Sequence, residues 1–182
     1  TFVLNTTPPQ PPVITSQITT PTKTPNQTIS GTKPADTSII INGIERVSLN
    51  SSTSWSYTYP LAERSNNISV TARDAAGNDS APATTSITLD TTPPSFVINT
   101  YKNPSPTPTQ TLTGTKEPGC IVKLNNATIF DSTDINSTWS YTLTLMQGIT
   151  NHFVFTAADA LGNTITKTVD ILYDVSAPAA LG

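Results

Sequence analysis

One stretch of the sequence occurs twice: Gln27-Thr28-Ile29-Ser30-Gly31-Thr32-Lys33 returns later in the chain as Gln110-Thr111-Leu112-Thr113-Gly114-Thr115-Lys116. A second motif, Trp55-Ser56-Tyr57-Thr58, returns as Trp139-Ser140-Tyr141-Thr142 at nearly the same offset. The two motifs keep their order and nearly their spacing. The chain therefore contains an internal repeat, which is the first feature to look for in a sequence rich in Thr, Ser, Asn and Pro.

A third motif and a boundary motif complete the repeat. Asp74-Ala75-Ala76-Gly77-Asn78 returns as Asp159-Ala160-Leu161-Gly162-Asn163, again at nearly the same offset. Leu89-Asp90-Thr91-Thr92-Pro93-Pro94 closes the first copy and opens the second, with partial echoes near both chain ends. We therefore expect a first domain at residues 6–90 and a second at residues 91–174. Residues 1–5 are expected to be the remnant of a preceding repeat, and residues 175–182 the start of a following repeat or a tail.

Each copy is built from short runs of alternating apolar and polar residues, bounded by Gly, Pro and Asn, and this pattern indicates strands. The strands predicted for the first copy lie near residues 12–18, 27–32, 38–41, 44–48, 54–60, 67–73 and 84–90. Those of the second copy follow at the repeat offsets. Seven short antiparallel strands in about 85 residues are typical of an immunoglobulin-like sandwich. The predicted fold class is all-β, with two tandem immunoglobulin-like seven-stranded antiparallel β-sandwiches.

Comparing the copies predicts which side chains point inward. Ile39 and Ile41 match apolar residues of the second copy, whereas Ile40 matches Lys123 and is expected to point outward. Trp55 and Trp139 share strand faces with other large apolar residues, so we expect core packing rather than exposed platforms for sugars. Asn42-Gly43 predicts a type I′ hairpin turn, because that turn needs positive φ at both central residues.

A proline-rich stretch at residues 104–109 has the composition of a mucin-like linker. It occupies the same place in the repeat as residues 20–25. We therefore expect both stretches to be edge segments that join the first two strands of their copy, where a missing N–H donor is tolerated.

The composition excludes several classes of protein. Only 12% of the 182 residues are charged, and 16 prolines would break almost any long helix. A formal net charge of -3 offers no basic surface for phosphates, so no nucleic-acid binding is expected. No run approaches the roughly 20 apolar residues of a membrane span, so this sequence is not expected to insert into a membrane. A single cysteine, Cys120, cannot form an internal disulfide.

Four motifs in order carry a resemblance to a known family, three of them present twice and the fourth present once with partial echoes. Gly-Thr near the second strand, Trp-Ser-Tyr-Thr, Thr-Ala-x-Asp-Ala-x-Gly-Asn and Asp-Thr-Thr-Pro-Pro together resemble bacterial Ig-like (BIg-type) tandem repeats. The resemblance implies extracellular or cell-surface stalks, as in adhesins, and spacer modules of secreted enzymes. The sequence departs from the family pattern at Asn5, where the family has Asp, and at Ala177-Pro178, which replaces Pro-Pro.

Three functions from different classes can be compared. The leading hypothesis is a non-catalytic structural spacer of a bacterial surface or secreted protein, which is expected to be a monomer with neighbouring repeats of the same chain as its partners. A host or matrix protein or glycan would then be bound through other domains. The alternative is a carbohydrate- or protein-binding accessory module of a secreted enzyme. That alternative needs exposed aromatic residues that differ between the copies, and Tyr101 is the candidate.

An enzyme is the third class, and it needs convergent ionisable groups in a pocket. His152 is the one histidine of the sequence, and it is expected on the solvent-facing side of its strand beside the inward Phe153. Cys120 stands at a strand start, aligned with Thr37, and has no base near it in the pattern. The sequence therefore predicts no enzyme activity.

A calcium site is expected at the junction between the domains, because strands alternate in direction along each copy. The turn at residues 159–163 should then lie at the end of the second domain that faces the linker. The last strand of the first domain should place Asp90 at the same end. The predicted ligands are Asp90, Asp159, Asn163 and Glu117, since Ca²⁺ takes about six to eight oxygen ligands, including carboxylates. The resemblance implies the same, because related repeats often carry interdomain calcium. The alternative is that Asp74 and Asp159 cap tight turns closed by the following Gly-Asn pairs.

Overall fold

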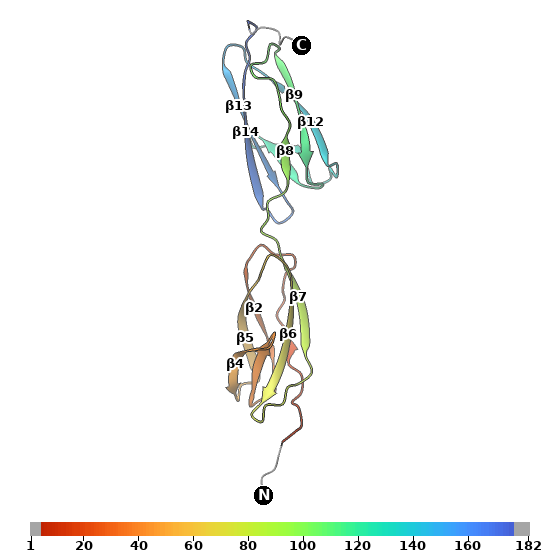
Figure 1. Cartoon of the computed structure of the whole chain (residues 1–182), viewed down its shortest axis with the longest axis vertical. Coiled ribbons are helices and arrows are strands. Elements are labelled where there is room, and N and C mark those ends of the chain that lie inside the picture. The colour runs from red at the N-terminus through yellow and green to blue at the C-terminus, as the bar shows by residue number, and fades with distance from the viewer. Residues whose placement is uncertain (1–4, 177–182) are drawn as a thin grey trace. The chain divides into compact units, whose positions relative to one another are not determined.

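The structure is a computed structural model that describes residues 5–176, and all regular elements of these residues are strands. The chain divides into two compact units, Thr1–Thr91 and Thr92–Gly182. Strands β1 to β7 belong to the first unit and β8 to β14 to the second (Figure 1). The parts of the predicted terminal segments at residues 1–4 and 177–182 lie outside the described residues.

The first unit is a sandwich of two antiparallel sheets. Its strands are β1 (Val13–Ile14), β2 (Asn26–Thr32), β3 (Thr37–Ile41), β4 (Ile44–Asn50), β5 (Ser54–Pro60), β6 (Arg64–Asp74) and β7 (Ala83–Leu89). One sheet has the order β1-β2-β5 and the other β4-β3-β6-β7. The apolar core of the unit includes Ile29 from the first sheet and Ile39 and Val70 from the second, none of which is exposed.

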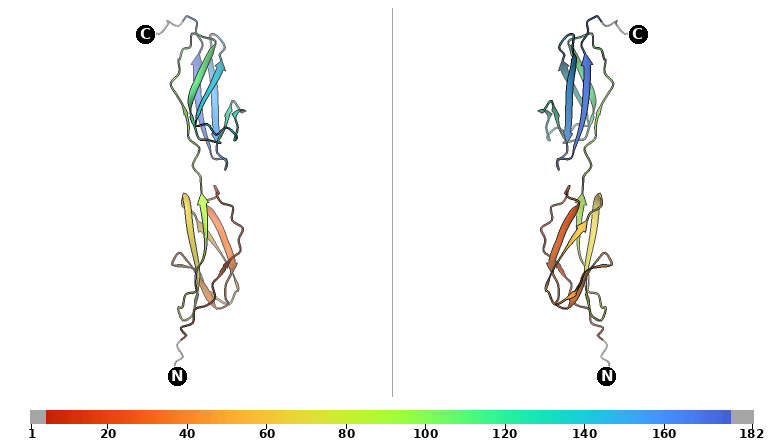
Figure 2. Two further views of the ribbon diagram at one scale, coloured as in Figure 1. Left: turned by 90° about the vertical axis from the view of Figure 1, so that its right-hand side faces the viewer. Right: turned by 90° about the vertical axis from the view of Figure 1, so that its left-hand side faces the viewer.

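The second unit repeats this arrangement strand for strand (Figure 2). Its strands are β8 (Phe96–Ile98), β9 (Thr109–Lys116), β10 (Ile121–Leu124), β11 (Ala127–Phe130), β12 (Thr138–Thr144), β13 (Thr150–Ala158) and β14 (Thr164–Leu172). The sheets have the orders β12-β9-β8 and β11-β10-β13-β14. The predicted fold class, all-β with two tandem immunoglobulin-like sandwiches, is confirmed.

Each core contains one tryptophan, and the prediction of core packing is confirmed. Trp55 is 4% exposed and Trp139 is 5% exposed. The indole N–H of Trp55 donates to the Thr32 carbonyl at 3.2 Å, and that of Trp139 donates to the Val97 carbonyl at 3.1 Å. Both rings are therefore buried with their single polar atom satisfied, as a buried indole requires.

The glycine of the repeated Gly-Thr-Lys motif is required by a close backbone approach. A Cβ atom on Gly31 would lie 1.7 Å from the Val13 carbonyl oxygen, and one on Gly114 would lie 1.9 Å from that of Val97. No side chain fits at either distance. The motif therefore marks the place where the short first strand lies close against the second strand in each unit.

The first strand is shorter than predicted. The alternation predicted a strand near residues 12–18, but β1 contains only Val13 and Ile14. The amides of Thr15 and Ser16 both donate to the Ser30 carbonyl, at 2.9 and 3.2 Å. Two donors on one acceptor interrupt the regular ladder, so the strand ends there although the apolar alternation continues.

The proline-rich stretches are edge segments, as predicted. After β1 the chain crosses to the other sheet, where the amide of Thr22 donates to the Thr88 carbonyl at 2.9 Å and Thr22 bridges Leu89 in parallel. In the second unit, the amide of Ser105 donates to the Leu172 carbonyl at 2.8 Å. Each stretch therefore covers the end of an otherwise open edge strand, β7 or β14.

The hairpin between β3 and β4 has the predicted turn, because φ is 49° at Asn42 and 81° at Gly43. Ile40, on β3 before this turn, has the predicted outward register but is nevertheless buried. It is absent from the core cluster, which agrees with its outward register, yet it is only 4% exposed. Glu45 and Thr71 pair with it on the two flanking strands, so their side chains cover this central strand on its outer face.

Candidate functional site

The repeated Asp-to-Asn turns are the best-defined polar sites of the two units. In the first, the Asp74 Oδ1 atom accepts from the backbone amides of Ala76 and Asn78 at 3.0 and 2.9 Å. The Asn78 side-chain amide donates to Asp74 Oδ2 at 2.9 Å. These bonds, those from Asn78 above all, hold the pKa of the Asp74 carboxyl below its usual value. The carboxylate thus caps its own turn.

The second turn has the same construction. The Asp159 Oδ1 atom accepts from the amides of Leu161 and Asn163 at 2.9 and 2.8 Å, and Oδ2 accepts from the Asn163 side chain at 2.8 Å. Partial burial raises the pKa of Asp159, but the bonds from Asn163, Leu161 and Gly162 outweigh it, so the pKa lies below the usual value. Two of the predicted calcium ligands, Asp159 and Asn163, are therefore brought together, and they bind each other.

The residue at the start of the described chain contacts the first turn. The Asn5 side-chain amide donates to Asp74 Oδ2 at 3.0 Å, and the Asn78 side-chain amide donates to the Asn5 carbonyl at 3.0 Å. Asn5 occupies the place in the repeat that Asp90 occupies before the second unit. In the first unit this place is filled by a residue that can donate a hydrogen bond to the turn, which an ionised aspartate cannot do.

The other two predicted calcium ligands, Glu117 and Asp90, follow strands of different units. Glu117 follows β9, and its backbone amide donates to the Ser95 carbonyl at 2.9 Å. Asp90 follows β7 in the first unit, and its backbone amide donates to the Thr22 carbonyl at 2.9 Å. Among the described residues, no group of three or more His, Cys, Asp or Glu side chains could hold a metal ion. A calcium site shared by Asp90, Asp159, Asn163 and Glu117 stays a prediction.

Two buried lysines, which the sequence analysis did not single out, occupy the last position of the Gly-Thr-Lys motif. Lys33 is 4% exposed, and its Nζ atom donates to the carbonyls of Thr37 and Asn50 at 2.8 and 3.0 Å. Burial lowers the pKa of Lys33, while the nearby Asp36 carboxylate opposes the shift. Lys116 is 3% exposed and donates to the Asp134 carbonyl at 2.7 Å. Each lysine ties the loop before the tryptophan strand to the rest of its unit.

Two asparagines form a second repeated clamp. The Asn66 Oδ1 atom accepts from the Ala62 amide at 2.8 Å, and its Nδ2 atom donates to three carbonyls, including that of Ile87 at 3.2 Å. Asn151 makes the same set of bonds with Met146, Ile149 and Ile171. Asn66 and Asn151 are separated by the same offset as the two Asp-to-Asn turns, and this was the available signal. These clamps fix the loop that leads into β6 or β13.

His152 is exposed, as predicted, but it has a partner that the sequence did not indicate. Its Nδ1 atom lies 2.5 Å from Asp170 Oδ1, and both side chains are more than half exposed. The register of β13 on β14 places these two residues opposite each other. Cys120 is 1% exposed, and burial raises the pKa of its thiol. Neither group has the buried, oriented set of partners that nucleophilic catalysis needs.

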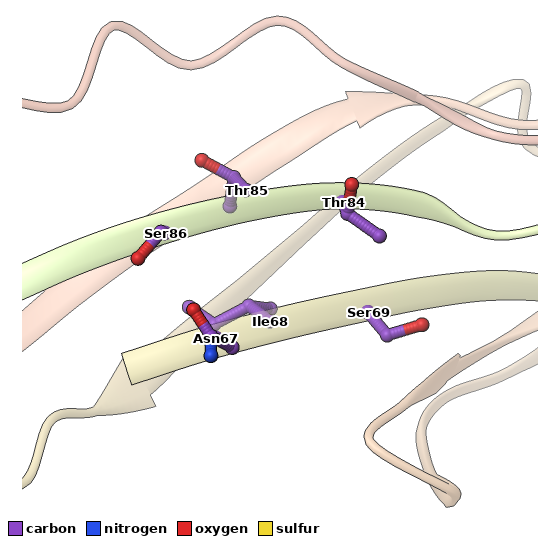
Figure 3. Close-up of a pocket in the computed structure, with 6 residues that line it drawn as sticks. All are labelled: Asn67, Ile68, Ser69, Thr84, Thr85 and Ser86. Atoms are coloured by element: carbon purple, nitrogen blue, oxygen red, sulfur yellow. The ribbon is translucent and has the colours of Figure 1, made fainter. Parts of the chain in front are cut away.

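A shallow groove runs along β6 and β7 of the first unit, with a volume of about 410 Å³. Figure 3 shows that Asn67, Ile68 and Ser69 lie on one strand and residues 84–86 on the strand beside it. Asn67, Ser69 and the hydroxyls of residues 84–86 can donate and accept hydrogen bonds, and none of these side chains titrates near neutral pH. The groove therefore carries no acid–base chemistry of its own.

Comparison with known protein families gives a match within the first unit. Residues 14–91 match the family model described as a bacterial Ig-like domain. No match was found among curated proteins. No helix among the described residues is long and apolar enough to cross a membrane.

Several solved structures are similar to the whole chain. The fibronectin(III)-like modules of CbhA from Clostridium thermocellum are 13% identical, with 94% of this chain and 98% of that chain covered and a TM-score of 0.39. The human desmocollin-1 ectodomain is 13% identical, with 95% and 38% covered and a TM-score of 0.40. The central fibronectin-III array of RIM-binding protein is 15% identical, with 91% and 69% covered and a TM-score of 0.32.

Proposed function

Because residues 14–91 belong to the bacterial Ig-like domain family and the second unit repeats their motifs, we propose that the chain is a non-catalytic structural spacer of a bacterial cell-surface or secreted protein. Domains of this family are generally non-catalytic and typically occur in extracellular or surface proteins. In an adhesin, such modules in series would hold a functional tip away from the cell. Neighbouring repeats of the same chain would be the partners of each module.

The observation that carries this proposal is that each unit has its own apolar core and its own copy of the tryptophan, the lysine and the asparagine that hold it together. The first unit has Trp55, Lys33 and Asn66, and the second has Trp139, Lys116 and Asn151 at the equivalent places. A module with its own apolar core could in principle fold alone, so it can be added to or removed from an array. This is the property that a spacer requires.

The outer face of β9 and β12 in the second unit suits an inert role. On β9 and β12 the exposed positions are all hydroxyl residues, paired in register as Thr109 with Thr144, Thr111 with Thr142, Thr113 with Ser140 and Thr115 with Thr138. A face of neutral hydroxyls is well hydrated and carries neither charge nor an apolar patch. It therefore gives no strong attraction to other macromolecules or to other copies of the module.

The segment between the units is short and contains two prolines. β7 ends at Leu89 and β8 begins at Phe96, and Pro93 and Pro94 lie between them. Proline fixes φ and restricts the residue before it, so this segment has fewer accessible conformations than a Gly/Ser linker. The Glu63 carboxylate also accepts from the amide and hydroxyl of Thr91, at 3.1 and 2.8 Å from its two oxygens, which fastens the start of the segment to the first unit.

Replacement of the two units by unrelated modules in the parent protein tests the spacer proposal. Replacing residues 1–182 by two unrelated Ig-like modules of similar length should leave adhesion or enzyme activity at the tip unchanged, whereas deleting them should reduce the reach of the tip and its activity on a distant surface. If the exchange reduced activity as much as the deletion, the units themselves would recognise something, and the spacer proposal would be wrong.

A second candidate function is an accessory module that binds a carbohydrate. The observation that favours it is confined to the second unit, where Tyr101 and Lys167 line one groove. A spacer does not require either residue.

A further inference from the structure

We propose that the second unit binds an anionic sugar in a groove between the open edges of β8 and β14. This proposal rests on the second candidate function and not on the spacer role. The groove has a volume of about 290 Å³ and is lined by residues 96–98 and Tyr101 on one side and by residues 167–169 on the other. This volume is just below the usual range for small-molecule sites, about 300–1,000 Å³. It suits one or two sugar rings rather than a large ligand.

Backbone groups of both strands face this groove. The amide of Asn99 donates to the Thr113 carbonyl on β9 at 2.8 Å, and backbone direction alternates along an antiparallel strand, so the polar groups of Phe96 and Ile98 face away from β9. On β14, the Leu172 carbonyl accepts from Ser105 and the Asp170 carbonyl from Asn103, both on the side away from β13.

By the same alternation, the N–H and C=O groups of Thr168 face the open edge of β14. Within the described part of the chain, no strand pairs with β8 or β14 on this side. The groove thus offers backbone donors and acceptors on both walls, and sugar hydroxyls can bond to either kind of group.

Lys167 gives the groove its charge. It occupies a core-facing register position of β14, between Ile165 and the buried Val169, yet its side chain is exposed. An ammonium at such a position lies over the open side of the sandwich, because the edge of the core is the place where a long side chain can reach water. Of the described residues that line the groove, Lys167 alone is charged. The groove therefore favours an anion over a neutral ligand.

Tyr101 gives the groove an aromatic surface. The side chain is half-buried and packs against the core cluster of the second unit, which holds the ring in place. A fixed ring with one accessible side can contact the C–H groups of a sugar at low entropic cost, and its hydroxyl can bond to a sugar oxygen. A carboxylate on the same sugar could then reach Lys167, which points to a uronic acid.

The first unit lacks both residues. Ile18 stands at the place of Tyr101 in the repeat, and Ala83 stands at the place of Lys167 in the strand register. The fold therefore does not require Tyr101 or Lys167. The two open edges would also accept an extended acidic peptide, but β8 has only three residues, Phe96–Ile98, and residues 103–105 already cover the end of β14. A short groove favours the sugar.

Titration of the whole ¹⁵N-labelled chain with trigalacturonate, followed by NMR, tests the proposal. We expect shifts of the Ile98 and Thr168 amides with a dissociation constant of about 1 mM. Tyr101→Ile combined with Lys167→Ala installs the residues of the first unit, so it should fold normally and bind about tenfold or more weakly. Lys123→Ala, which removes one exposed lysine of β10 outside the groove, should bind like the parent.

Three outcomes would overturn the proposal. The first is the absence of shifts at the groove at about 10 mM trigalacturonate. The second is equal binding of neutral maltotriose, since Lys167 would then select nothing. The third is undiminished binding by the double variant. If the first outcome came with a response to an acidic peptide of alternating Glu and Val, the groove would be a peptide site.

Discussion

At the residue scale, the two tryptophans occupy equivalent places but have different neighbours. Trp139 stacks on Phe96 with ring centroids 5.3 Å apart and lies 5.9 Å from Phe155. Trp139→Ala should destabilise the second unit by about 3–5 kcal/mol, because it removes a large buried surface and leaves a cavity. Chemical denaturation measures the change, with the exposed Thr142→Ala on the same strand as a control expected within about 0.5 kcal/mol. Equal effects of both substitutions would place the indole outside the core.

The Asp74 carboxyl makes the stability of the first unit depend on pH. Bonds from Asn78 hold its pKa in the folded unit below the usual value of 3.8. A lowered folded pKa contributes stability that is fully present above the unfolded pKa and is lost as the pH falls through the folded pKa. The stability of the first unit should therefore decline below about pH 4. Asp74→Asn should remove part of this response in acid denaturation, and an unchanged acid profile in that variant would assign the response to other groups.

At the element scale, one asparagine fixes the loop between β12 and β13. Asn151 is 6% exposed and binds the backbone at both ends of that loop and on β14. Asn151→Ala should cost the second unit about 2–3 kcal/mol, because it leaves buried backbone groups without partners. Met146→Ala in the same loop is the matched control, since the Met146 side chain is 66% exposed and should matter little. Equal unfolding midpoints of the two variants would show that the clamp contributes nothing.

The strands and their core-facing positions could be predicted from the sequence, because the two copies can be aligned with each other and compared position by position. Positions that stay apolar, such as Ile39 and Val122, identified the inward face, and both are fully buried. Strand ends were harder to predict, since the end of β1 depends on which carbonyl two successive amides share. The outer-face burial of Ile40 depends on the flanking strands, which periodicity within one strand does not describe.

The sequence did not predict most of the polar side-chain bonds, for a related reason. Lys33 and Asn66 act through bonds to backbone carbonyls of loops, and loop conformation has no periodic signal. The pairing of His152 with Asp170 requires the register of β13 on β14, which is fixed only in the folded sheet. The Asp-to-Asn turns could be read from the sequence, because Asp at the start of a tight turn accepts from the amides that follow it.

At the scale of the whole molecule, the calcium prediction depends on a difference between the two repeats. Asn5 precedes the first unit at the place in the repeat where Asp90 precedes the second. Asn5 can donate to the Asp74 turn, whereas Asp90 adds a carboxylate, so the second copy should bind calcium better than the first. Calorimetric titration should give heat and a rise in melting temperature at about 1 mM Ca²⁺. Asp90→Ala and Asp159→Ala should each abolish both effects. Absence of heat and of any shift in melting temperature in the parent chain would contradict the calcium site. Asp74 and Asp159 would then serve only as turn caps.

Within residues 5–176 the two core clusters have no residue in common, so the folding of the two units should be separable. The one tryptophan in each unit makes this measurable. Leu112, 1% exposed, lies in the second core. We would follow denaturation by the fluorescence of Trp55 in a Trp139→Phe chain and of Trp139 in a Trp55→Phe chain, each with and without Leu112→Ala. We expect Leu112→Ala to shift the Trp139 transition by about 2–5 kcal/mol and to leave the Trp55 transition unchanged. A shift of both transitions together would show one cooperative unit and would contradict the description of the chain as two autonomous modules.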